Sequence, residues 1–357
     1  MRIVALGLSL SSSWGNGHAT TYRALFKGLA ARGHEILFLE RDRPWYAAHR
    51  DLTNPGYCDL RFYNSLDELN AWQRQMIDAD AVIVGSYVPE GTAAGAFVQR
   101  NAAGVTAFYD IDTPVTLRKL SSGDEEYLSP GLIPGYDLYL SFTGGPTLRR
   151  LESQYRAHAA RALYCSVDPD LYSPVDVPCQ WDLGYIGTYS ADRQPALEQL
   201  VLEPARRRPD LRFVVAGAQY PDDIAWPGNV DRIDHLSPVE HARFYSSLGW
   251  TLNITRADMI AAGWSPSVRL FEAAACLTPI VSDWWSGLDQ FFHPGSEICI
   301  VSSTEQLLAA LASPAARRQA LAGRARQHVL AAHTAAKRAT ELEAYLLRAQ
   351  RRASRAA

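Results

Sequence analysis

Short apolar runs alternate with amphipathic stretches along the chain, and this alternation predicts its secondary structure. The first half contains the predicted strands Ile3–Leu8, Glu35–Leu39, Leu60–Tyr63, Ala81–Val84, Val105–Tyr109, Leu138–Phe142 and Ala162–Cys165. Amphipathic stretches between them predict helices at His18–Ala31, Leu66–Met76, Thr92–Asn101 and Pro146–Gln154. Strands that alternate with helices predict a parallel sheet covered on both faces.

The same pattern starts again in the second half. Its predicted strands are Asp182–Ile186, Arg212–Ala216, Val230–Ile233, Thr251–Ile254, Pro279–Val281 and Ile298–Val301. Its predicted helices are Ala196–Arg207, Val239–Leu248, Val268–Cys276 and Thr304–Leu311. The segment Asp168–Pro178 contains three prolines and is typical of a linker. We therefore predict an α/β protein with two doubly wound, Rossmann-like domains, whose ligands bind at the carboxyl ends of strands.

A chain of 357 residues exceeds what one hydrophobic core usually serves, which agrees with two domains. We expect domains at residues 1–167 and 168–334, followed by a C-terminal helix and basic tail at 335–357. The first residues lack the layout of a signal peptide, and no apolar run reaches the length of a membrane span. Five scattered cysteines without a CxxC pair fit a cytoplasmic protein without a zinc site or disulfide framework.

The stretch Thr251–Asp283 contains the chemistry on which a functional interpretation depends. Ser265 and Pro266 are favoured residues at a helix start, and a helix start offers free N–H groups and a partial positive charge to a phosphate. Glu272 lies six residues after Pro266, about 9 Å along a helix axis, which is close to the separation of a nucleotide's pyrophosphate and its ribose. Alternatively, Arg269 and Glu272 are an i,i+3 pair that only decorates a helix surface.

The block SPSVRLFEAAACLTPIVSD, followed by Gly287 and Leu288, resembles the donor-binding segment of CgeB-like glycosyltransferases. These proteins are relatives of the large retaining glycosyltransferase group with the GT-B fold. The resemblance implies two Rossmann-like domains that face each other across a cleft, and a C-terminal helix that crosses back to the first domain. It implies that Glu272 holds the ribose of a nucleotide-sugar donor. A second acidic residue is common eight positions earlier in that group, but Trp264 stands there in this sequence.

The resemblance implies further donor contacts around this segment. The first turn of the helix contributes Ser265, Ser267, Val268 and Arg269, and the strand-to-loop segment YIGTYSADR contributes Gly187, Thr188 and Arg193. A guanidinium at Arg193 suits a diphosphate because it contacts two phosphate oxygens at once. The alternative for Arg193 is an exposed residue at a helix start.

The first predicted strand runs into a Ser- and Gly-rich loop, and His18 then starts a helix. Gly15-Asn16-Gly17 is not a full dinucleotide fingerprint, so by itself the spacing is a weak signal. By resemblance, Gly15, Gly17 and His18 lie at the cleft, the glycines near the donor and the histidine near the chemistry. The alternative for His18 is a helix-start residue without a ligand.

In the segment FYDIDTP, two carboxylates follow a predicted strand. Paired acids bind sugar hydroxyls, hold a metal or act as acid and base, but no third ligand lies close by in the sequence, which disfavours a metal. The YDIDTP wording also occurs in CgeB-like proteins. We expect a catalytic or acceptor role for Asp112 first and Asp110 second, against an Asx-type turn before Pro114.

Trp284 and Trp285 are adjacent in a predicted loop. Indole rings stack on the apolar faces of sugars, so one of them is a candidate for a sugar or acceptor subsite. Packing at an interface between the domains is the equal alternative.

The segment from Arg317 to the C-terminus contains ten Lys and Arg residues and two Glu residues, whereas the whole chain carries a net charge of −3. A solvated helix face with a frayed tail is the simplest interpretation, and weak contact with an anionic membrane surface is an alternative. No nucleic-acid motif is present, and we expect no nucleic-acid partner.

Together these features predict a metal-independent GT-B glycosyltransferase that moves a sugar from a nucleotide diphosphate to an unidentified acceptor, with retention of configuration implied by the family. No cofactor is expected beyond the donor substrate. Two alternatives remain open: a GT-B epimerase or hydrolase of nucleotide sugars, and a non-catalytic protein that binds a sugar or nucleotide in its cleft.

Overall fold

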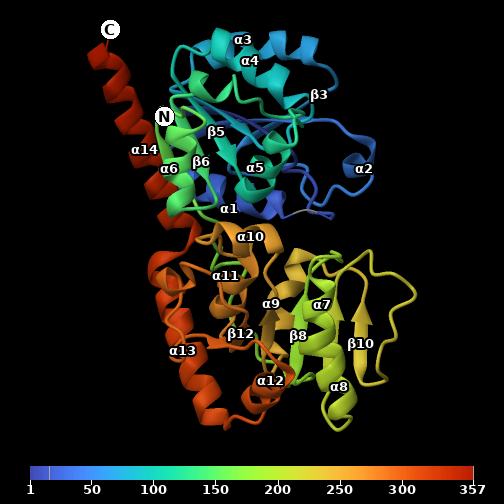
Figure 1. Cartoon of the computed structure of the whole chain (residues 1–357). Coiled ribbons are helices and arrows are strands. Elements are labelled where there is room, and N and C mark those ends of the chain that lie inside the picture. Colours follow the sequence, from blue (N-terminus) through green and yellow to red (C-terminus); the bar gives the residue numbers. More distant parts are fainter. Residues whose placement is uncertain (16, 357) are drawn as a thin grey trace. The chain divides into compact units, whose positions relative to one another are not determined.

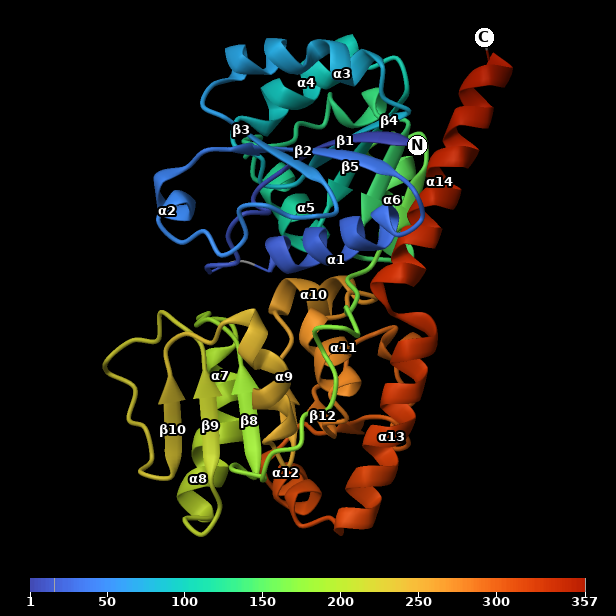
Figure 2. The same cartoon turned by 180° about the vertical axis from the view of Figure 1, so that it is seen from behind.

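The computed structural model describes residues 1–15 and 17–356, and the chain divides into two compact units. Unit 1 comprises Met1–Ser166 together with the C-terminal segment from Ala335, and unit 2 comprises Val167–Thr334. Each unit contains one parallel β-sheet with helices packed on it (Figures 1 and 2). The predicted α/β class with two doubly wound sheets is confirmed.

Unit 1 has a seven-stranded sheet in the order β3-β2-β1-β4-β5-β6-β7. Its strands are β1 (Arg2–Gly7), β2 (Glu35–Arg41), β3 (Asp59–Tyr63), β4 (Ala81–Gly85), β5 (Val105–Asp110), β6 (Leu138–Ser141) and β7 (Ala160–Ala162). Its helices are α1 (His18–Ala30), α2 (Pro44–Ala47), η1 (Leu66–Trp72), α3 (Gln73–Ile77), α4 (Gly91–Asn101), α5 (Thr113–Ser121), η2 (Ile133–Gly135), α6 (Pro146–Ser153) and α14 (Ala335–Ala356). The strand order reverses between β1 and β4, where sheets of this type bind ligands.

Alternate side chains of the inner strands in unit 1 enter two separate hydrophobic cores. Val4 and Leu6 of β1 belong to one core, whereas Ile3 and Ala5 belong to the other. Both faces of the strands are therefore buried, which explains why their sequences are continuously apolar.

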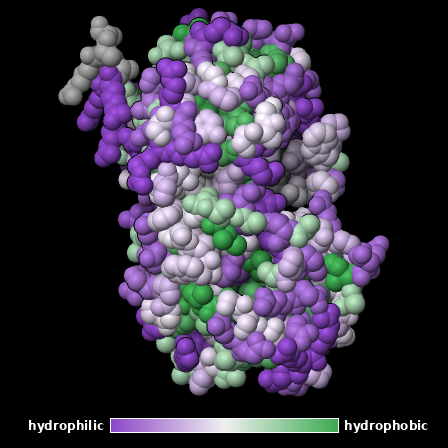
Figure 3. Space-filling view, in the orientation of Figure 1, coloured by the Kyte–Doolittle hydropathy of each residue, from purple (hydrophilic) through white to green (hydrophobic). Residues whose placement is uncertain are grey.

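Helix α14 belongs to the second core of unit 1. The residues that it contributes to this core are Ala339, Leu342, Leu346 and Ala349. It packs on α1 at Gly28, where a Cβ would lie 2.9 Å from the carbonyl oxygen of Ala335, so only glycine allows this approach. The part of α14 toward the C-terminus is hydrophilic on the face visible in Figure 3. Among the helices of the described residues, none combines the length and hydrophobicity needed to cross a bilayer.

Unit 2 has a six-stranded sheet in the order β10-β9-β8-β11-β12-β13. Its strands are β8 (Leu183–Ile186), β9 (Phe213–Ala216), β10 (Val230–Ile233), β11 (Thr251–Asn253), β12 (Ile280–Ser282) and β13 (Cys299–Ile300). Its helices are α7 (Gln194–Leu197), η3 (Glu198–Leu202), α8 (Glu203–Arg207), α9 (Pro238–Ser246), α10 (Ala257–Ala262), α11 (Val268–Ala275), η4 (Leu288–Gln290), α12 (Thr304–Leu311) and α13 (Ala315–Ala332). Here the strand order reverses between β8 and β11, the same place in the topology as in unit 1.

The structure corrects several predicted helices. The stretch predicted as one helix at Leu66–Met76 is a 3-10 helix followed by α3, and the one predicted at Ala196–Arg207 contains a π-helical turn between α7 and α8. Helix α11 begins at Val268, two residues after Pro266, with Ser267 as its N-cap. A short helix, α10, occupies the stretch before it, for which the sequence analysis predicts neither a strand nor a helix. None of its residues is buried, so its sequence has no amphipathic pattern.

Candidate active site

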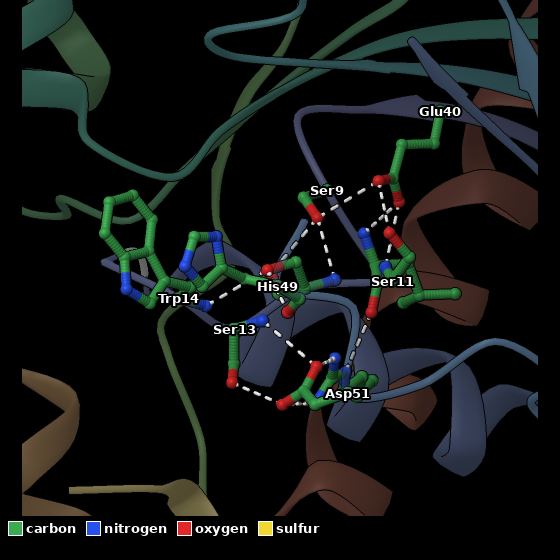
Figure 4. Close-up of polar contacts among 10 residues, drawn as sticks. Ser9, Ser11, Ser13, Trp14, Glu40, His49 and Asp51 are labelled. Carbon is green, nitrogen blue, oxygen red and sulfur yellow. Dashed lines mark hydrogen bonds and ion pairs between the residues drawn. The ribbon is translucent and has the colours of Figure 1, made fainter. Parts of the chain in front are cut away.

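A buried carboxylate fixes the loop that follows β1 in unit 1. Glu40, at 1% exposure on β2, accepts hydrogen bonds from the backbone N–H groups of Leu10 (2.6 Å) and Ser11 (2.9 Å) and from the Ser11 hydroxyl (2.6 Å). The Ser9 hydroxyl donates a further bond of 3.2 Å, and Figure 4 shows these groups converging on Glu40. The first part of the loop is therefore held rigidly, although its sequence resembles that of a flexible segment.

The next part of the loop is held by Asp51. Its carboxylate accepts bonds from the Ser13 hydroxyl (2.5 Å) and from Arg23 Nη2 (2.5 Å). The Trp14 ring stacks on His49 with centroids 4.5 Å apart (Figure 4), yet Trp14 remains 41% exposed. The loop thus presents an aromatic ring to solvent immediately before Gly15.

The predicted residues at the end of this loop lie at the start of α1. Gly15 has φ +65° and Gly17 is the N-cap of α1, and a Cβ at either position would meet open space. Asn16 lies outside the described residues. His18 is the first helical residue, and its Nδ1 is buried without a hydrogen-bond partner among the described residues. Desolvation by burial lowers the pKa of His18 to about 4, so the ring is neutral at pH 7.

Tyr87 joins His18 to Asp112 at the switch point of the unit 1 sheet. The rings of His18 and Tyr87 meet edge to face at 5.1 Å, and the Tyr87 hydroxyl donates a 3.2 Å bond to Asp112 Oδ2. Tyr87 follows β4 directly and has φ +62°, a backbone conformation that costs free energy in a residue with a large side chain. Two of the predicted catalytic residues are therefore brought together by a tyrosine that the sequence analysis did not select.

Asp110 has a different environment. It is fully buried at the end of β5 and accepts bonds from the hydroxyls of Tyr139 (2.5 Å) and Thr116 (2.7 Å). Burial raises the pKa of Asp110 to about 6, and these two hydrogen bonds oppose the rise. Its Oδ1 also lies 3.4 Å from the backbone nitrogen of Asp112, which is the Asx-type contact named as the alternative. Asp110 thus makes the contact of the alternative interpretation, and its catalytic role stays a prediction.

In unit 2, the loop after β8 closely approaches the end of β9. A Cβ at Gly217 would lie 2.0 Å from the carbonyl oxygen of Gly187, so this approach requires glycine at position 217. The guanidinium of Arg269 lies close to Gly187, where a Cβ would lie 3.1 Å from Arg269 Nη2. The loop then passes through Thr188 to Arg193, the N-cap residue of α7.

Two arginines come together at this switch point without a carboxylate partner. Arg193 is 9% exposed, and its Nη2 donates a 2.5 Å bond to the carbonyl oxygen of Thr188. Arg269 Nη1 donates to Asn253 Oδ1 (3.3 Å) and to the carbonyl oxygen of Ile254 (3.2 Å). The Nε atoms of both arginines are buried without a partner, and no described carboxylate forms an ion pair with either.

The electrostatics at this switch point favour an anion. Burial and then the positive charge of Arg269 lower the pKa of Arg193 from its ordinary value. A buried guanidinium beside a second positive charge is costly to a folded chain unless an anion binds there. Arg193 is therefore not the exposed residue of the alternative interpretation.

Glu272 is enclosed on the inner side of α11. It is 4% exposed, accepts a 3.1 Å bond from the Tyr245 hydroxyl, and its Oε2 lies 3.9 Å from His241 Nδ1. The described residues place no ion pair between Glu272 and Arg269, so the two do not form the surface pair of the alternative interpretation. Ser265 is buried at 3%, whereas Ser267 and Val268 are partly exposed at the start of the helix.

The loops before α11 and after β12 are fastened to each other. Asp283 accepts bonds from the backbone N–H (3.0 Å) and hydroxyl (2.8 Å) of Thr255, and burial raises the pKa of Asp283. The N–H of Trp264 donates a 2.6 Å bond to the carbonyl oxygen of Ser286. Its ring covers Gly287, where a Cβ would lie 2.5 Å from the indole.

The chain is similar to one protein family and to several solved structures. Residues 193–344 match the family described as glycosyl transferase-like. No curated protein matches the chain in sequence. The sucrose-phosphate synthase of Thermosynechococcus elongatus has a similar structure, with 13% identity, 96% of this chain and 97% of that chain covered, and a TM-score of 0.66. HepE of Anabaena, in complex with UDP-glucose, is also similar in structure. The identity is 11%, 97% of this chain and 99% of that chain are covered, and the TM-score is 0.70. A third similar structure is an alpha-glucosyltransferase in complex with UDP-glucose and DNA containing an abasic site. The identity is 13%, 97% of this chain and 99% of that chain are covered, and the TM-score is 0.71.

The chain has the GT-B fold. The predicted fold class is thereby confirmed for both units. In unit 2, Gly187 lies close to Arg269, and Arg269 lies close enough to Arg193 to act on its charge. In unit 1, His18 and Asp112 meet through Tyr87.

The two tryptophans in the loop after β12 differ in burial. Trp284 is 49% exposed, whereas Trp285 is 1% exposed and packs against Phe291 at a centroid distance of 5.9 Å. The predicted stacking of Trp285 on a sugar is therefore wrong, because neither face of its ring is open to a sugar. Trp284 remains a candidate.

Several residues of this site carry no local sequence signal. Glu40 bonds to a loop about 30 positions away, and Asp51 and Tyr245 likewise act on distant segments. Tyr87 had one usable signal, since it follows a predicted strand at the expected switch point.

Proposed function

We propose that this protein is a glycosyltransferase that binds a nucleotide-diphosphate sugar in unit 2. The observation that supports this most directly is the pair of neighbouring guanidinium groups of buried Arg193 and partly exposed Arg269, whose Nε atoms have no hydrogen-bond partner and which form no ion pair with a described carboxylate. They lie beside the switch point of a Rossmann-like sheet, and the N-terminus of α11 follows Ser267 nearby in the sequence. A diphosphate supplies the negative charge that this arrangement lacks.

In this proposal the arginines and the helix N-terminus stabilise the charge that develops on the leaving diphosphate. Because positive charge is already in place, the diphosphate can leave without a resident metal ion. Glu272 accepts hydrogen bonds from ribose hydroxyls, and its orientation is fixed by Tyr245. Gly187 and Thr188 supply backbone close to the phosphates.

Unit 1 supplies the acceptor side. Asp112 and neutral His18 are the polar groups proposed to orient the acceptor hydroxyl, with Tyr87 holding them together. In a retaining transfer, the leaving phosphate oxygen can accept the proton of that hydroxyl, so neither residue has to act as a dedicated base. Trp284 and the exposed ring of Trp14 are candidates for stacking on a sugar.

The finer assignments rest on the same features. Similarity to CgeB-like proteins in the α11 segment supports placement near that group, and retention follows from it. A cytoplasmic location, an acceptor other than nucleic acid and weak membrane contact through α14 are part of the proposal. UDP-glucose is the first donor to test, because HepE and the alpha-glucosyltransferase bind it in their structures.

A nucleotide titration tests the proposal. Calorimetric titration with UDP, GDP, ADP, dTDP and CMP, followed by their sugar conjugates, should give one preferred diphosphate and a higher melting temperature in its presence. Product analysis then separates the alternatives: transfer to an added acceptor supports a transferase, whereas isomerised or hydrolysed donor alone indicates an epimerase or hydrolase. Absence of binding to every diphosphate would refute the donor site.

A further inference from the structure

Three potential metal ligands converge in unit 2, away from the residues proposed to bind the donor. His293 and Glu297 lie in the loop between η4 and β13, and His328 lies on α13. Glu297 Oε2 is 3.0 Å from His293 Nδ1 and 2.8 Å from His328 Nδ1. All three ligand atoms lie within 4.8 Å of one another. Residue spacing does not reveal this cluster, because β13, α12 and most of α13 lie between Glu297 and His328 in the sequence.

The hydrogen bonding of Glu297 is uneven. The carboxylate is 8% exposed, and its Oε2 faces the backbone N–H of His293 (2.8 Å) in addition to the two imidazole nitrogens. Three donors on one oxygen exceed its two lone pairs, whereas the described residues place no hydrogen bond on Oε1. No described Lys or Arg forms an ion pair with Glu297. A cation among these atoms would instead use the lone pairs of both imidazole nitrogens and of the carboxylate.

We propose that His293, Glu297 and His328 bind a divalent metal ion of the zinc type. Two imidazoles and one carboxylate are a ligand set that zinc uses, with a water molecule in the fourth position. Ligands of a tetrahedral zinc ion lie about 2.0–2.1 Å from the metal and hence about 3.3 Å from one another. The separations of the two imidazole nitrogens from Glu297 Oε2 are shorter than that by a few tenths of an ångström, so small side-chain movements suffice. Magnesium and calcium prefer oxygen ligands and do not fit this set.

The position of the cluster indicates what the ion does. Phe292 precedes His293 and stacks on Phe271 of α11 with centroids 5.9 Å apart, and His333 after α13 stacks on the same ring at 4.6 Å. An ion that ties the loop to α13 therefore fixes both neighbours of Phe271, the residue before Glu272. The proposed ion therefore acts on the packing around α11, and the proposal stands independently of the transferase activity.

Zinc titration of the full chain tests the proposal. The protein is prepared without an affinity tag and stripped with EDTA, and it carries Cys179→Ser because the exposed thiol of Cys179 also binds zinc. Calorimetry should then show one zinc ion bound, a higher melting temperature with zinc, and no response to magnesium. The His293→Ala/His328→Ala variant should bind zinc at least about tenfold more weakly.

Two further variants make the outcome decisive. Glu297→Gln removes the charge but keeps an oxygen that accepts the His293 N–H, so weaker zinc binding there cannot come from loss of the loop's hydrogen bond. His158→Ala removes an exposed histidine of unit 1 and should bind zinc like the parent. Equal zinc affinity in the parent and the double-histidine variant would overturn the proposal, as would a parent that binds no zinc. Circular dichroism of each metal-free variant verifies that it is folded.

Discussion

The two sheets of this protein have the same strand order around their switch points, but the side chains gathered there have opposite electrostatic character. Unit 1 places a neutral histidine, a tyrosine and two carboxylates at the ends of β1, β4 and β5. Unit 2 places Arg193 and Arg269 at the ends of β8 and β11, with no carboxylate paired to them among the described residues. Topology therefore determines where a ligand binds, whereas the side chains determine its charge.

The two switch points also differ in whether their buried polar groups have hydrogen-bond partners. In unit 1, the hydroxyls of Tyr139 and Thr116 satisfy the buried carboxylate of Asp110. In unit 2, the Nε donors of Arg193 and Arg269 stay unused, and no described carboxylate forms an ion pair with either arginine. A protein that keeps unused buried donors carries a stability cost that only ligand binding removes. Unit 2 is thus expected to respond to an anion far more than unit 1.

Removal of Arg193 is expected to have the largest effect. Arg193→Met keeps much of the side-chain volume but deletes two charge-assisted hydrogen bonds to a diphosphate, each worth about 1.5–3 kcal/mol. Nucleotide affinity should fall at least about 100-fold by calorimetry. The melting temperature without ligand should not fall, because a desolvated charge beside Arg269 disappears. Arg206→Gln, at an exposed arginine paired with Glu198, is the control and should bind normally. Unchanged nucleotide affinity in Arg193→Met would remove the main support for the donor site.

The buried carboxylate of unit 1 should make stability depend on pH. In the folded protein the pKa of Asp110 is raised to about 6 from an ordinary value of 3.8. Its contribution to the free energy of unfolding is therefore fully present below pH 3.8 and is lost as the pH rises through 6. The loss amounts to about 3 kcal/mol. Urea unfolding at pH 4 and pH 7.5 should show a smaller decrease in Asp110→Asn than in the parent. The contribution of His18, whose lowered pKa has the opposite sign, is common to both proteins and cancels. Parallel pH profiles would show that Asp110 does not titrate as described.

Asp112 allows the two regions to be separated by function. Asp112→Asn keeps the size of the side chain and removes the charge that faces the Tyr87 hydroxyl. Sugar transfer should slow about 100-fold while donor affinity stays unchanged, because the donor belongs to unit 2. Asp78→Asn, at an exposed carboxylate, serves as the control. A loss of donor affinity that matches the loss of rate would mean that the division between acceptor and donor sides is wrong.

The sequence predicted the strands well because parallel strands buried on both faces require continuous apolar runs, as in Val82–Val84 and Phe213–Ala216. It failed where no such requirement exists. Helix α10 buries no residue, so nothing in its sequence distinguishes it from a loop. The site was predicted only in part for a related reason: Arg193 and Glu272 lie in a recognisable local motif, whereas Glu40 acts through contacts with distant residues. Burial, which separates Trp284 from Trp285, depends on packing that a local pattern does not contain.

The smallest expected effect concerns Glu272, and it tests whether the charge contrast extends to the ribose. Glu272→Gln retains a hydrogen-bond acceptor for the Tyr245 hydroxyl, so unit 2 should stay folded. One weakened bond to a ribose hydroxyl costs about 1–1.5 kcal/mol, so affinity for UDP should fall about tenfold. Affinity for 2′-deoxy-UDP, which lacks one of the hydroxyls, should already be low in the parent and should fall less on mutation. If both nucleotides lose affinity equally, Glu272 acts through the packing of α11 rather than through the ribose, and the acidic residue of unit 2 then belongs to the scaffold.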